Sequence, residues 1–407
     1  MSSAKVYTPI SPLPSYFSSN PRGELSATEQ SMYNEVLAHF SPGTYALPNV
    51  EKGELSEFEK FWVSRECILR YLRASKWKVD TAIQRLENSL KWRREYGLYD
   101  KLTPEYVEPE ALTGKEILFG FSSSGKPAFY MVPSRQNTQE SPRQVEFAVW
   151  MLERSIDLMP AGVENVAWLI NFAQRAKNPS LGIARQVVNI LQDHYPERLG
   201  LALAINVPFL ISAFFKLVLP FVDPVTREKL KFNPNVVKDG LFAEDQCMAD
   251  AWGGNQDFEY VHETYWKALV YKAEEARAKH IAKWKDLGAN VGISEWDYKE
   301  GEKAASGEGI EETEADVSVS IPKPKEAIVT VLDVPESEPV STTTTPAPSA
   351  DAVPMIKEEE HKHKDTIVTN TTVVGGSGHG GTAAAGATAT GGGDGGDAGA
   401  DGGAAAE

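Results

Sequence analysis

The spacing of apolar residues differs between two parts of the chain. In the first hundred residues apolar positions recur at helical spacing, and the pairs Ser26 with Glu29 and Ser56 with Glu59 have the capping-box spacing that marks helix starts. A further helix begins near Asp80 and ends at Gly97. Its apolar face is Val79, Ala82, Ile83, Leu86 and Leu90. The pattern predicts a helical subdomain over 25–105, preceded at 1–24 by a flexible arm rich in Ser and Pro.

From Glu116 the pattern changes to short apolar runs separated by helices. The runs Glu116–Phe121, Ala128–Val132, Val166–Phe172 and Leu201–Val207 predict buried strands. Ser141-Pro142 opens a helix with the apolar face Val145, Ala148, Val149, Leu152, Ile156 and Met159, and Asn178-Pro179-Ser180 opens another that carries Ala184, Val187, Val188 and Leu191. Strands that alternate with helices indicate βαβ crossovers, so we expect an α/β domain with a mostly parallel sheet over 106–258.

The end of the chain has a different composition. A charged helical pattern occupies 259–305, and no aromatic residue follows Tyr298. From Ser306 onward, 5 Lys or Arg stand against 18 Asp or Glu, which is −13 of the total charge of −16. We expect 306–407 to be a disordered acidic tail rich in Gly, Ala and Thr, because it lacks the apolar residues that offset the entropy of folding. His361 and His363 lie in this tail and receive no metal role.

Cysteine content and the N-terminal sequence bear on the compartment. Only Cys67 and Cys247 are present, and the first residues lack the charged-then-apolar pattern of a secretory signal. Position 2 is Ser, so the glycine needed for myristoylation is missing. These features predict a reduced, cytosolic protein.

Nucleotide binding and catalysis find little support in the motifs. The segment Gly120–Lys126 matches most of a phosphate-binding P-loop, but Pro127 stands where a magnesium-binding Ser or Thr is required. The two flanking apolar runs are so close together that we predict a hairpin turn instead. There is no G-x-S-x-G elbow, HExxH motif or CxxC pair. His194 is expected to be a helix cap or a polar surface group, and we expect no catalytic residue.

The segment Phe209–Val222, FLISAFFKLVLPFV, is unusual because 11 of its 14 residues are apolar. A membrane span would have to extend back to Leu199, and Asn206, Pro208, Lys216 and Pro220 interrupt such a run. A buried or interfacial helix is therefore the better interpretation. Two alternatives remain: an ordinary core helix, or a helix that alternates between covering a cavity and touching a membrane.

The order of these features resembles the CRAL-TRIO family of lipid-exchange proteins, and specifically the fungal Sec-fourteen type of phosphatidylinositol transfer protein. The resemblance rests on ILRYLRASKW at 68–77, KWRREYG at 91–97, HYPERLG at 194–200, INVPF at 205–209 and DPVT at 223–226. It covers about 55–255. RQNT at 135–138 further resembles the fungal subgroup linked to drug resistance. The family resemblance implies one phosphatidylinositol in a hydrophobic pocket floored by the sheet, with no cofactor, metal, nucleotide or nucleic acid.

The resemblance also implies which residues bind the headgroup. Lys76 matches a basic headgroup contact, although Ser75 stands where the family often has a second basic residue. Glu197 matches an acidic residue that accepts hydrogen bonds from the inositol ring or orders a basic neighbour. Thr226 and Lys229 match the hydroxyl and the ammonium that receive the phosphate. Without the resemblance, an ion-pair cluster is the simpler interpretation of Glu197 and Lys229.

The family has a second ligand position, where Ser and Thr hydroxyls bind a choline headgroup. Val166 and Trp168 stand at the corresponding positions here and offer no hydroxyl, so we expect an apolar second ligand such as a sterol in place of phosphatidylcholine. Phe209–Val222 corresponds to the family's gate helix, with Phe209, Phe214, Phe215, Lys216 and Phe221 as its contact residues.

Such a protein would touch membranes transiently. The candidate locations are the endoplasmic reticulum, the cell periphery and lipid droplets. The competing functions are a lipid hydrolase and a membrane-anchored lipid-sensing scaffold.

Overall fold

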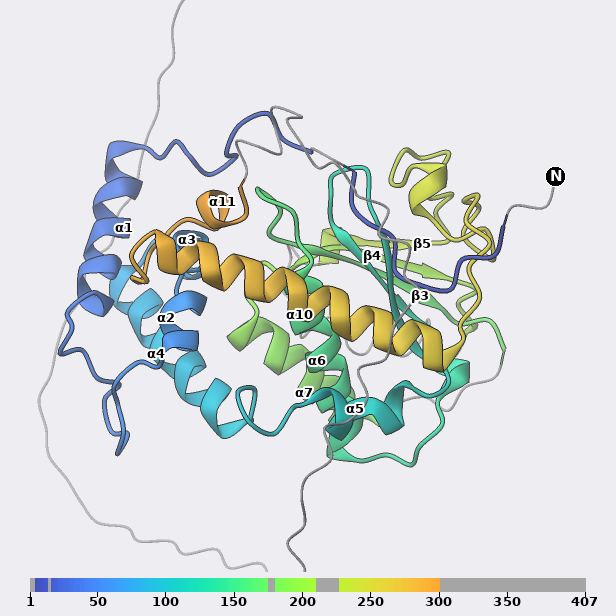
Figure 1. The fold of residues 1–407 in the computed structure, drawn as a ribbon, viewed down its shortest axis with the longest axis horizontal. Helices are drawn as coiled ribbons and strands as arrows, with labels where there is room; N and C mark the ends of the chain where they lie inside the picture. The colour runs from blue at the N-terminus through green and yellow to red at the C-terminus, as the bar shows by residue number, and fades with distance from the viewer. Residues whose placement is uncertain (1–3, 14–15, 175–179, 210–226, 301–407) are drawn as a thin grey trace, which may run out of the picture. The chain divides into compact units, whose positions relative to one another are not determined.

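The computed structural model describes residues 4–13, 16–174, 180–209 and 227–300, so the tail expected at 306–407 lies outside the described residues. One five-stranded sheet has the order β1-β2-β3-β4-β5 (Figure 1). The first strand is antiparallel to the second, and the remaining pairs are parallel. The strands are β1 Glu116–Phe121, β2 Pro127–Met131, β3 Val166–Asn171, β4 Leu199–Ile205 and β5 Leu230–Phe232. The predicted α/β fold with a mostly parallel sheet is confirmed.

The four predicted strands agree with the structure to within two residues at each end. The fifth, β5, was not predicted because three residues with two exposed side chains carry no apolar run. A tight turn joins β1 to β2: the amide of Ser122 donates to the carbonyl of Lys126 at 2.8 Å, and Gly125 has φ +77°. The P-loop-like segment is therefore a hairpin turn, as predicted.

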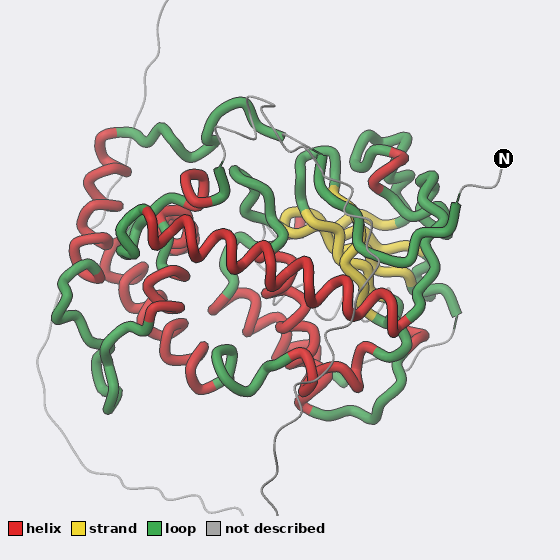
Figure 2. Tube along the Cα trace, in the orientation of Figure 1, coloured by secondary structure: helices red, strands yellow, loops and turns green. Residues whose placement is uncertain are grey.

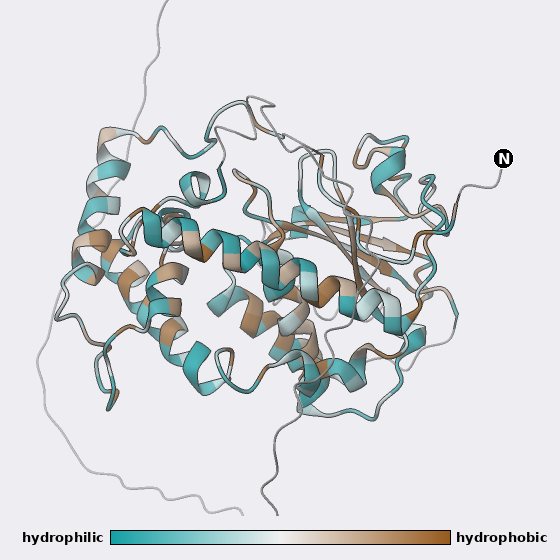
Figure 3. Cartoon of the chain, viewed as in Figure 1, coloured by the Kyte–Doolittle hydropathy of each residue, from teal (hydrophilic) through white to brown (hydrophobic). Residues whose placement is uncertain are grey.

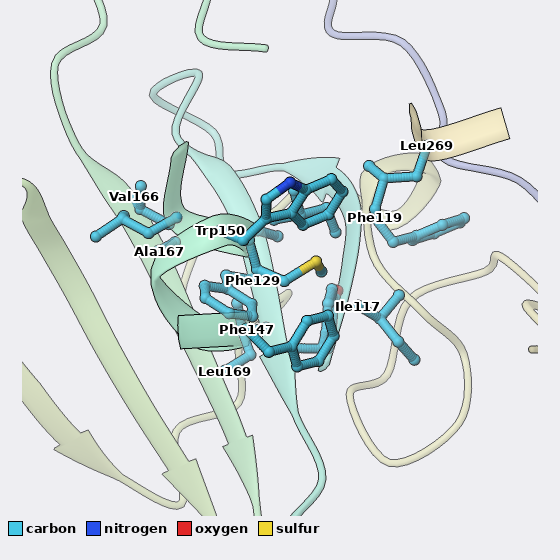
Figure 4. Packing of buried hydrophobic residues seen from close by; sticks show 14 of the residues in the cluster. Ile117, Phe119, Phe129, Phe147, Trp150, Val166, Ala167, Leu169 and Leu269 are labelled. Atoms are coloured by element: carbon cyan, nitrogen blue, oxygen red, sulfur yellow. The ribbon is translucent and has the colours of Figure 1, made fainter. Parts of the chain in front are cut away.

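Two helices connect the parallel strands. The helix α6, Pro142–Asp157, links β2 to β3, and α7, Leu181–His194, links β3 to β4. Beyond the predicted face, α6 also buries Phe147 and Trp150, which lie among the apolar side chains of the sheet (Figure 4). A long C-terminal helix covers its outer side, where the rings of Trp150 and Trp266 are 4.9 Å apart. The residues predicted for the buried face of α7 are only half-buried.

The first hundred residues form helices, which Figure 2 shows in red apart from the yellow strands. They are α1 Ala27–Phe40, α2 Glu57–Trp62, α3 Arg65–Ala74, α4 Val79–Glu95 and α5 Pro104–Ala111. The capping boxes at Ser26 and Ser56 are confirmed. A further cap, Ser64, starts α3 as a separate helix. The buried apolar residues of α1, α3 and α4 form a cluster distinct from the one around the sheet.

The C-terminal part of the domain consists mainly of the predicted charged helix. This helix, α10 His262–Asp286, carries many hydrophilic residues along its length (Figure 3) and is followed by the short helix α11 Glu295–Tyr298. The hydroxyl of Tyr265 bonds both the amide and the carbonyl of Leu118, at 2.6 and 3.0 Å, and so fixes α10 to β1. Short 3-10 turns lie at Pro133–Arg135 and Glu244–Gln246. No helix within the described ranges is long and apolar enough to cross a bilayer.

The N-terminal segment is extended and fixed to the domain along the residues that the structure describes. Val6 donates to the carbonyl of Asp257 at 3.0 Å and accepts from the amide of Glu259 at 2.9 Å. Further along, Arg22 forms an ion pair with Glu164 at 2.8 Å. The sequence predicted a flexible arm here, and the difference arises because its partners lie more than a hundred residues away in the chain.

Candidate functional site

Charged and polar residues gather at the amino ends of the parallel strands. Lys126 precedes β2, Asn165 precedes β3, Glu197 precedes β4 and Lys229 precedes β5. Because parallel strands place their amino ends at the same edge of a sheet, these residues lie side by side. We call Lys126, Asn165, Glu197, Gly200 and Lys229 the strand-start site. Two of the predicted headgroup residues, Glu197 and Lys229, belong to it.

Glu197 has a constrained backbone and an ordered carboxylate. Its φ of +58° lies in the left-handed region, and the Asn165 side chain donates to its carbonyl at 2.6 Å. The Nε of Arg73, in the last turn of α3, donates to Oε2 of Glu197 at 2.5 Å. Of the two roles expected for Glu197, this geometry provides the ordering of a basic neighbour.

The ammonium group of Lys229 has no carboxylate partner among the residues that the structure describes. Its Nζ donates to the carbonyl of Leu199 at 2.7 Å, and its own carbonyl accepts from the amide of Ala202 at 2.9 Å. The side chain is half-buried. Among the described residues no Asp or Glu lies within ion-pair distance of it, so its charge is balanced only by a backbone dipole.

Of the other two predicted headgroup residues, Lys76 is not brought into this arrangement. Lys76 lies three residues beyond Arg73, at φ +52°, with an exposed side chain that has no ion-pair partner in the part of the chain described here. No hydrogen bond joins it to Glu197 or Lys229. Thr226 lies outside the described residues.

A lysine that sequence reasoning did not select completes the strand-start site. In the pairing of β3 with β4, Val166 faces Leu199 and Ala167 faces Leu201, so Gly200 is the extra residue of a bulge. A Cβ built on Gly200 would lie 2.6 Å from both Cδ and Cε of Lys126. The aliphatic chain of Lys126 therefore passes directly over Gly200, which is possible only because position 200 has no side chain.

The electrostatic environment of Lys126 reflects its neighbours. Burial, and then the ammonium of Lys229, lower the pKa of Lys126 below its usual value. Its Nζ donates to the hydroxyl of Ser124. The sequence did contain a signal for this residue, since Lys126 is the lysine of the P-loop-like segment, but the turn interpretation gave its side chain no role.

The two residues predicted to contact a second ligand lie in β3. Val166 is fully buried, whereas Trp168 is half-buried and meets Phe129 edge-on at 6.0 Å. The indole Nε1 of Trp168 is buried and has no hydrogen-bond partner. Neither residue offers a hydroxyl group.

Most of the predicted gate lies outside the described residues, including Phe214, Phe215, Lys216 and Phe221. Phe209 is described, and its side chain is 84% exposed. The turn before it is tied to the sheet, because Asn206 donates to the side chains of Asn233 and Asn171 at 3.0 and 2.9 Å.

Behind Glu197 lies a buried ion-pair network, which we define as Arg70, Glu164, Arg198 and Glu295. Arg70 bonds Glu164 at 2.9 Å and Glu295 at 3.1 Å, and Arg198 approaches Glu295 at 3.9 Å. Burial raises the pKa of Glu164, but Arg70 and Arg73 together hold it below its usual value. The network joins α3, the start of β3 and α11, and Arg73 connects it to Glu197.

His194 and the cavities suggest no chemistry. His194 was expected to be a helix cap or a polar surface group. It is the last residue of α7 and is half-buried: its ring stacks on Trp92 at 4.1 Å and contacts Ser89 at 3.0 Å, and burial lowers its pKa to about 4. A cavity whose lining includes Arg93 and Glu153 has a volume of about 50 Å³, which is too small for a lipid. No group of His, Cys, Asp or Glu in these ranges is placed to hold a metal ion.

Comparison with known families places two domain matches on the chain. The CRAL/TRIO, N-terminal domain matches residues 32–88, and the CRAL/TRIO domain matches residues 112–254. The second match contains the whole sheet and the strand-start site. The first covers the helices that supply Arg70, Arg73 and Lys76.

Individual proteins are similar over longer stretches. A CRAL-TRIO domain-containing protein of Schizosaccharomyces pombe is 45% identical over 284 residues, which span 69% of this chain but 28% of that protein. The phosphatidylinositol transfer protein PDR17 of Saccharomyces cerevisiae is 38% identical over 298 residues, 68% of this chain and 84% of that protein. The SEC14 cytosolic factor of Candida glabrata is 30% identical over 183 residues, 40% of this chain and 61% of that protein.

Among solved structures, the crystal structure of Sfh5 matches with a TM-score of 0.44 at 17% identity. The match covers 61% of this chain and 97% of that one.

Proposed function

The chain belongs to the CRAL/TRIO family, and from that premise we propose that it binds one phosphatidylinositol molecule and transfers it between membranes without covalent chemistry. The similarity to PDR17, named as a phosphatidylinositol transfer protein and matched over 84% of its length, supports this choice of lipid. The match to SEC14 cytosolic factor extends the same support at lower coverage.

The observation that carries the proposal is the unpaired ammonium of Lys229 at the strand-start site. A phosphodiester that leaves water needs cationic and hydroxyl donors, or its desolvation costs several kcal/mol. Lys229 is half-buried, has no carboxylate partner in the described ranges, and so can provide a charge-assisted bond. We further propose that Thr226 donates a hydroxyl hydrogen bond to the phosphate and that the exposed Lys76 provides a second cation.

Glu197 has a positioning role in this proposal. Its carboxylate holds the guanidinium of Arg73 at 2.5 Å, and Arg73 in turn contacts Glu164 at 3.3 Å. The inositol hydroxyls are free to bond the second oxygen of Glu197, whose side chain is 33% exposed. Polar ring recognition and phosphate recognition would then occur side by side at one edge of the sheet.

A second, apolar ligand accompanies the inositol lipid in the proposal. Trp168 offers a broad ring and an unpartnered indole N–H on the sheet, and neither it nor Val166 provides the hydroxyl that a choline headgroup would use. A sterol has a flat apolar body with a single hydroxyl, which suits such a surface. Phosphatidylcholine is excluded on the same grounds.

The gate segment around Phe209 completes the transfer cycle that we propose. Phe209 exposes 84% of its side chain directly after β4, and such apolar surface is more stable against lipid than against water. The protein would accordingly work in the cytoplasm and contact membranes only while it exchanges its lipid.

The headgroup proposal is tested with Lys229→Ala and a matched control, Lys231→Ala. Both lysines lie at the start of β5, but Lys231 is exposed and outside the site. Loss of one charge-assisted bond is expected to slow phosphatidylinositol transfer between vesicles about tenfold or more in Lys229→Ala, because such a bond contributes roughly 1.5–3 kcal/mol. Lys231→Ala should transfer at the wild-type rate. Equal rates in both variants would contradict the assignment.

The alternative function, a lipid hydrolase, predicts that different lipid molecules accompany the purified protein. A transfer protein retains about one intact phosphatidylinositol per chain, whereas a hydrolase would release fatty acid or a free headgroup from added lipid. Mass spectrometry of the organic extract, before and after incubation with phosphatidylinositol vesicles, separates the two.

A further inference from the structure

The half-buried side chains of Lys126 and Lys229 both lie at the start of β4. Lys126 passes over the bulge residue Gly200 at the start of β4, and Lys229 bonds the carbonyl of Leu199, the residue immediately before Gly200. The ammonium of Lys229 is close enough to Lys126 to lower its pKa, in addition to the larger effect of burial. Both side chains thus converge on the same two residues of β4.

No carboxylate in the described part of the chain balances this pair. Among the residues that the structure describes, the Nζ of Lys126 bonds only the hydroxyl of Ser124, and the Nζ of Lys229 bonds only a backbone carbonyl. The carboxylate of the same site, Glu197, is already engaged by Arg73. Two like charges that are partly removed from water destabilise each other, so their persistence side by side indicates an anionic partner that is not part of the protein.

The combined charge of the two lysines matches a phosphate monoester better than a phosphodiester. A phosphodiester carries one negative charge and would leave one ammonium uncompensated, whereas a phosphate monoester carries between one and two negative charges near pH 7. Ammonium groups act as point charges with three donors each, which suits the several terminal oxygens of a monoester. The bulge at Gly200 supplies the space, because any larger residue there would collide with Lys126.

We propose that Lys126 and Lys229 form a two-cation subsite for a phosphate monoester, so that this protein also takes membrane lipids whose headgroup carries such a phosphate. The inference rests on the proposed function, because it places the monoester at the same edge of the sheet as the phosphatidylinositol headgroup. Two sources share this chemistry: a phosphate on the inositol ring and the headgroup of phosphatidic acid.

The experiment compares transfer of three lipids by the full chain. Donor vesicles of phosphatidylcholine contain a minor fraction of phosphatidylinositol, phosphatidylinositol 4-phosphate or phosphatidic acid. The wild type is expected to transfer at least one monoester lipid about fivefold or more faster than phosphatidylinositol, a preference worth roughly 1 kcal/mol. Faster transfer of phosphatidylinositol 4-phosphate alone would show that the site recognises a phosphate on the inositol ring. Faster transfer of both phosphatidylinositol 4-phosphate and phosphatidic acid would show that it recognises any phosphate monoester.

Two variants test the role of Lys126 by different means. Lys126→Met removes the charge and keeps the length of the side chain, and Gly200→Ala keeps the charge but places a methyl group where the chain of Lys126 lies. Each is expected to lower the monoester-to-phosphatidylinositol transfer ratio about fivefold, which removes the preference expected of the wild type. Lys231→Met, on the exposed strand nearby, should leave the ratio at its wild-type value.

Several results would overturn the inference. One is a wild type that shows no preference for either monoester lipid, and another is a Lys126→Met variant that slows all three lipids by the same factor. Failure of the underlying function gives a different result, since the wild type would then move none of the three lipids above the spontaneous rate. Thermal unfolding of each variant separates a misfolded protein from one with an altered site.

Discussion

The buried ion-pair network and the strand-start site lie next to each other, yet their charges are arranged in opposite ways. In the network, the carboxylates of Glu164 and Glu295 each have an arginine within 3.1 Å, and the side chains involved are at most 7% exposed. At the strand-start site, Lys126 and Lys229 are half-buried and no carboxylate pairs with either in the described part of the chain. Arg73, which touches both Glu164 and Glu197, connects the two regions.

This difference separates structural charges from binding charges. A buried pair that is complete inside the protein fixes one arrangement of the elements that it joins, and removing one partner leaves an uncompensated charge. A half-buried cation without a carboxylate partner gains no ion-pair stabilisation within the protein, which makes it a candidate for binding an anionic ligand. The balance of charge therefore distinguishes the two regions better than the number of charged residues does.

The largest expected effect is in the ion-pair network. Arg70→Met removes the cation that both Glu164 and Glu295 contact, and we expect the free energy of unfolding to fall by about 3–5 kcal/mol, as for other broken buried pairs. Chemical denaturation measures it. Lys279→Met, which removes an exposed pair with Glu275, is the control and should leave the midpoint unchanged. A stable Arg70→Met protein would show that the network is dispensable.

A second buried pair predicts how stability depends on pH. Burial opposes the charge of Glu153, but Arg93 and the hydroxyl of Tyr195 lower its pKa to about 2, against 4.5 in the unfolded chain. Because the folded pKa is the lower one, the stabilisation is complete above pH 4.5 and is lost as the pH falls towards 2. The full contribution is about 3 kcal/mol.

Denaturation of the wild type and Glu153→Gln at a series of pH values tests this dependence. The difference in unfolding free energy between the two proteins should be constant from pH 7 to 5 and shrink below 4.5. A difference that does not depend on pH would mean that Glu153 stabilises by packing and hydrogen bonding alone.

A smaller effect is expected at the rim of the network. Arg22 also pairs with Glu164, at 2.8 Å, but its side chain is 44% exposed and solvent screens the interaction. Arg22→Ala should therefore cost less than about 1 kcal/mol, since Arg70 remains to balance Glu164. Faster proteolysis of the N-terminal segment, with little change in the unfolding midpoint, is the expected result. A loss as large as that of Arg70→Met would mean that the arm, and not the buried arginine, holds Glu164.

The smallest expected effect is at the strand-start site. Lys126→Met removes a partly desolvated charge that is repelled by Lys229, so stability should stay the same or rise slightly, within the roughly 0.5 kcal/mol typical of surface substitutions. Thermal unfolding without lipid measures this. A clear loss of stability would place Lys126 with the structural charges and weaken its assignment as a ligand contact.

Local patterns in the sequence predicted the elements well. The two capping boxes, the four apolar runs and the helix that begins after Ser141 are all short-range features, and each corresponds to an element in the structure. The weak β5 and the separate start of α3 were missed, because one has only three residues and the other depends on the single cap Ser64. The flexible arm was predicted from composition, which cannot show a backbone pairing between Val6 and 257–259.

The fold class follows from the periodicity of the sequence alone. The family follows from contiguous motifs, and the resemblance that these motifs carry is what pointed to two residues of the candidate site, Glu197 and Lys229. Only the tertiary structure decided which charges are compensated. Arg70 meets Glu295 across 225 residues of chain, and Lys126 at the start of β2 reaches Gly200 in β4 over the intervening strand β3 because the bulge leaves room for it. Charge balance depends on distances between atoms from remote segments, and no local pattern of residues contains those distances.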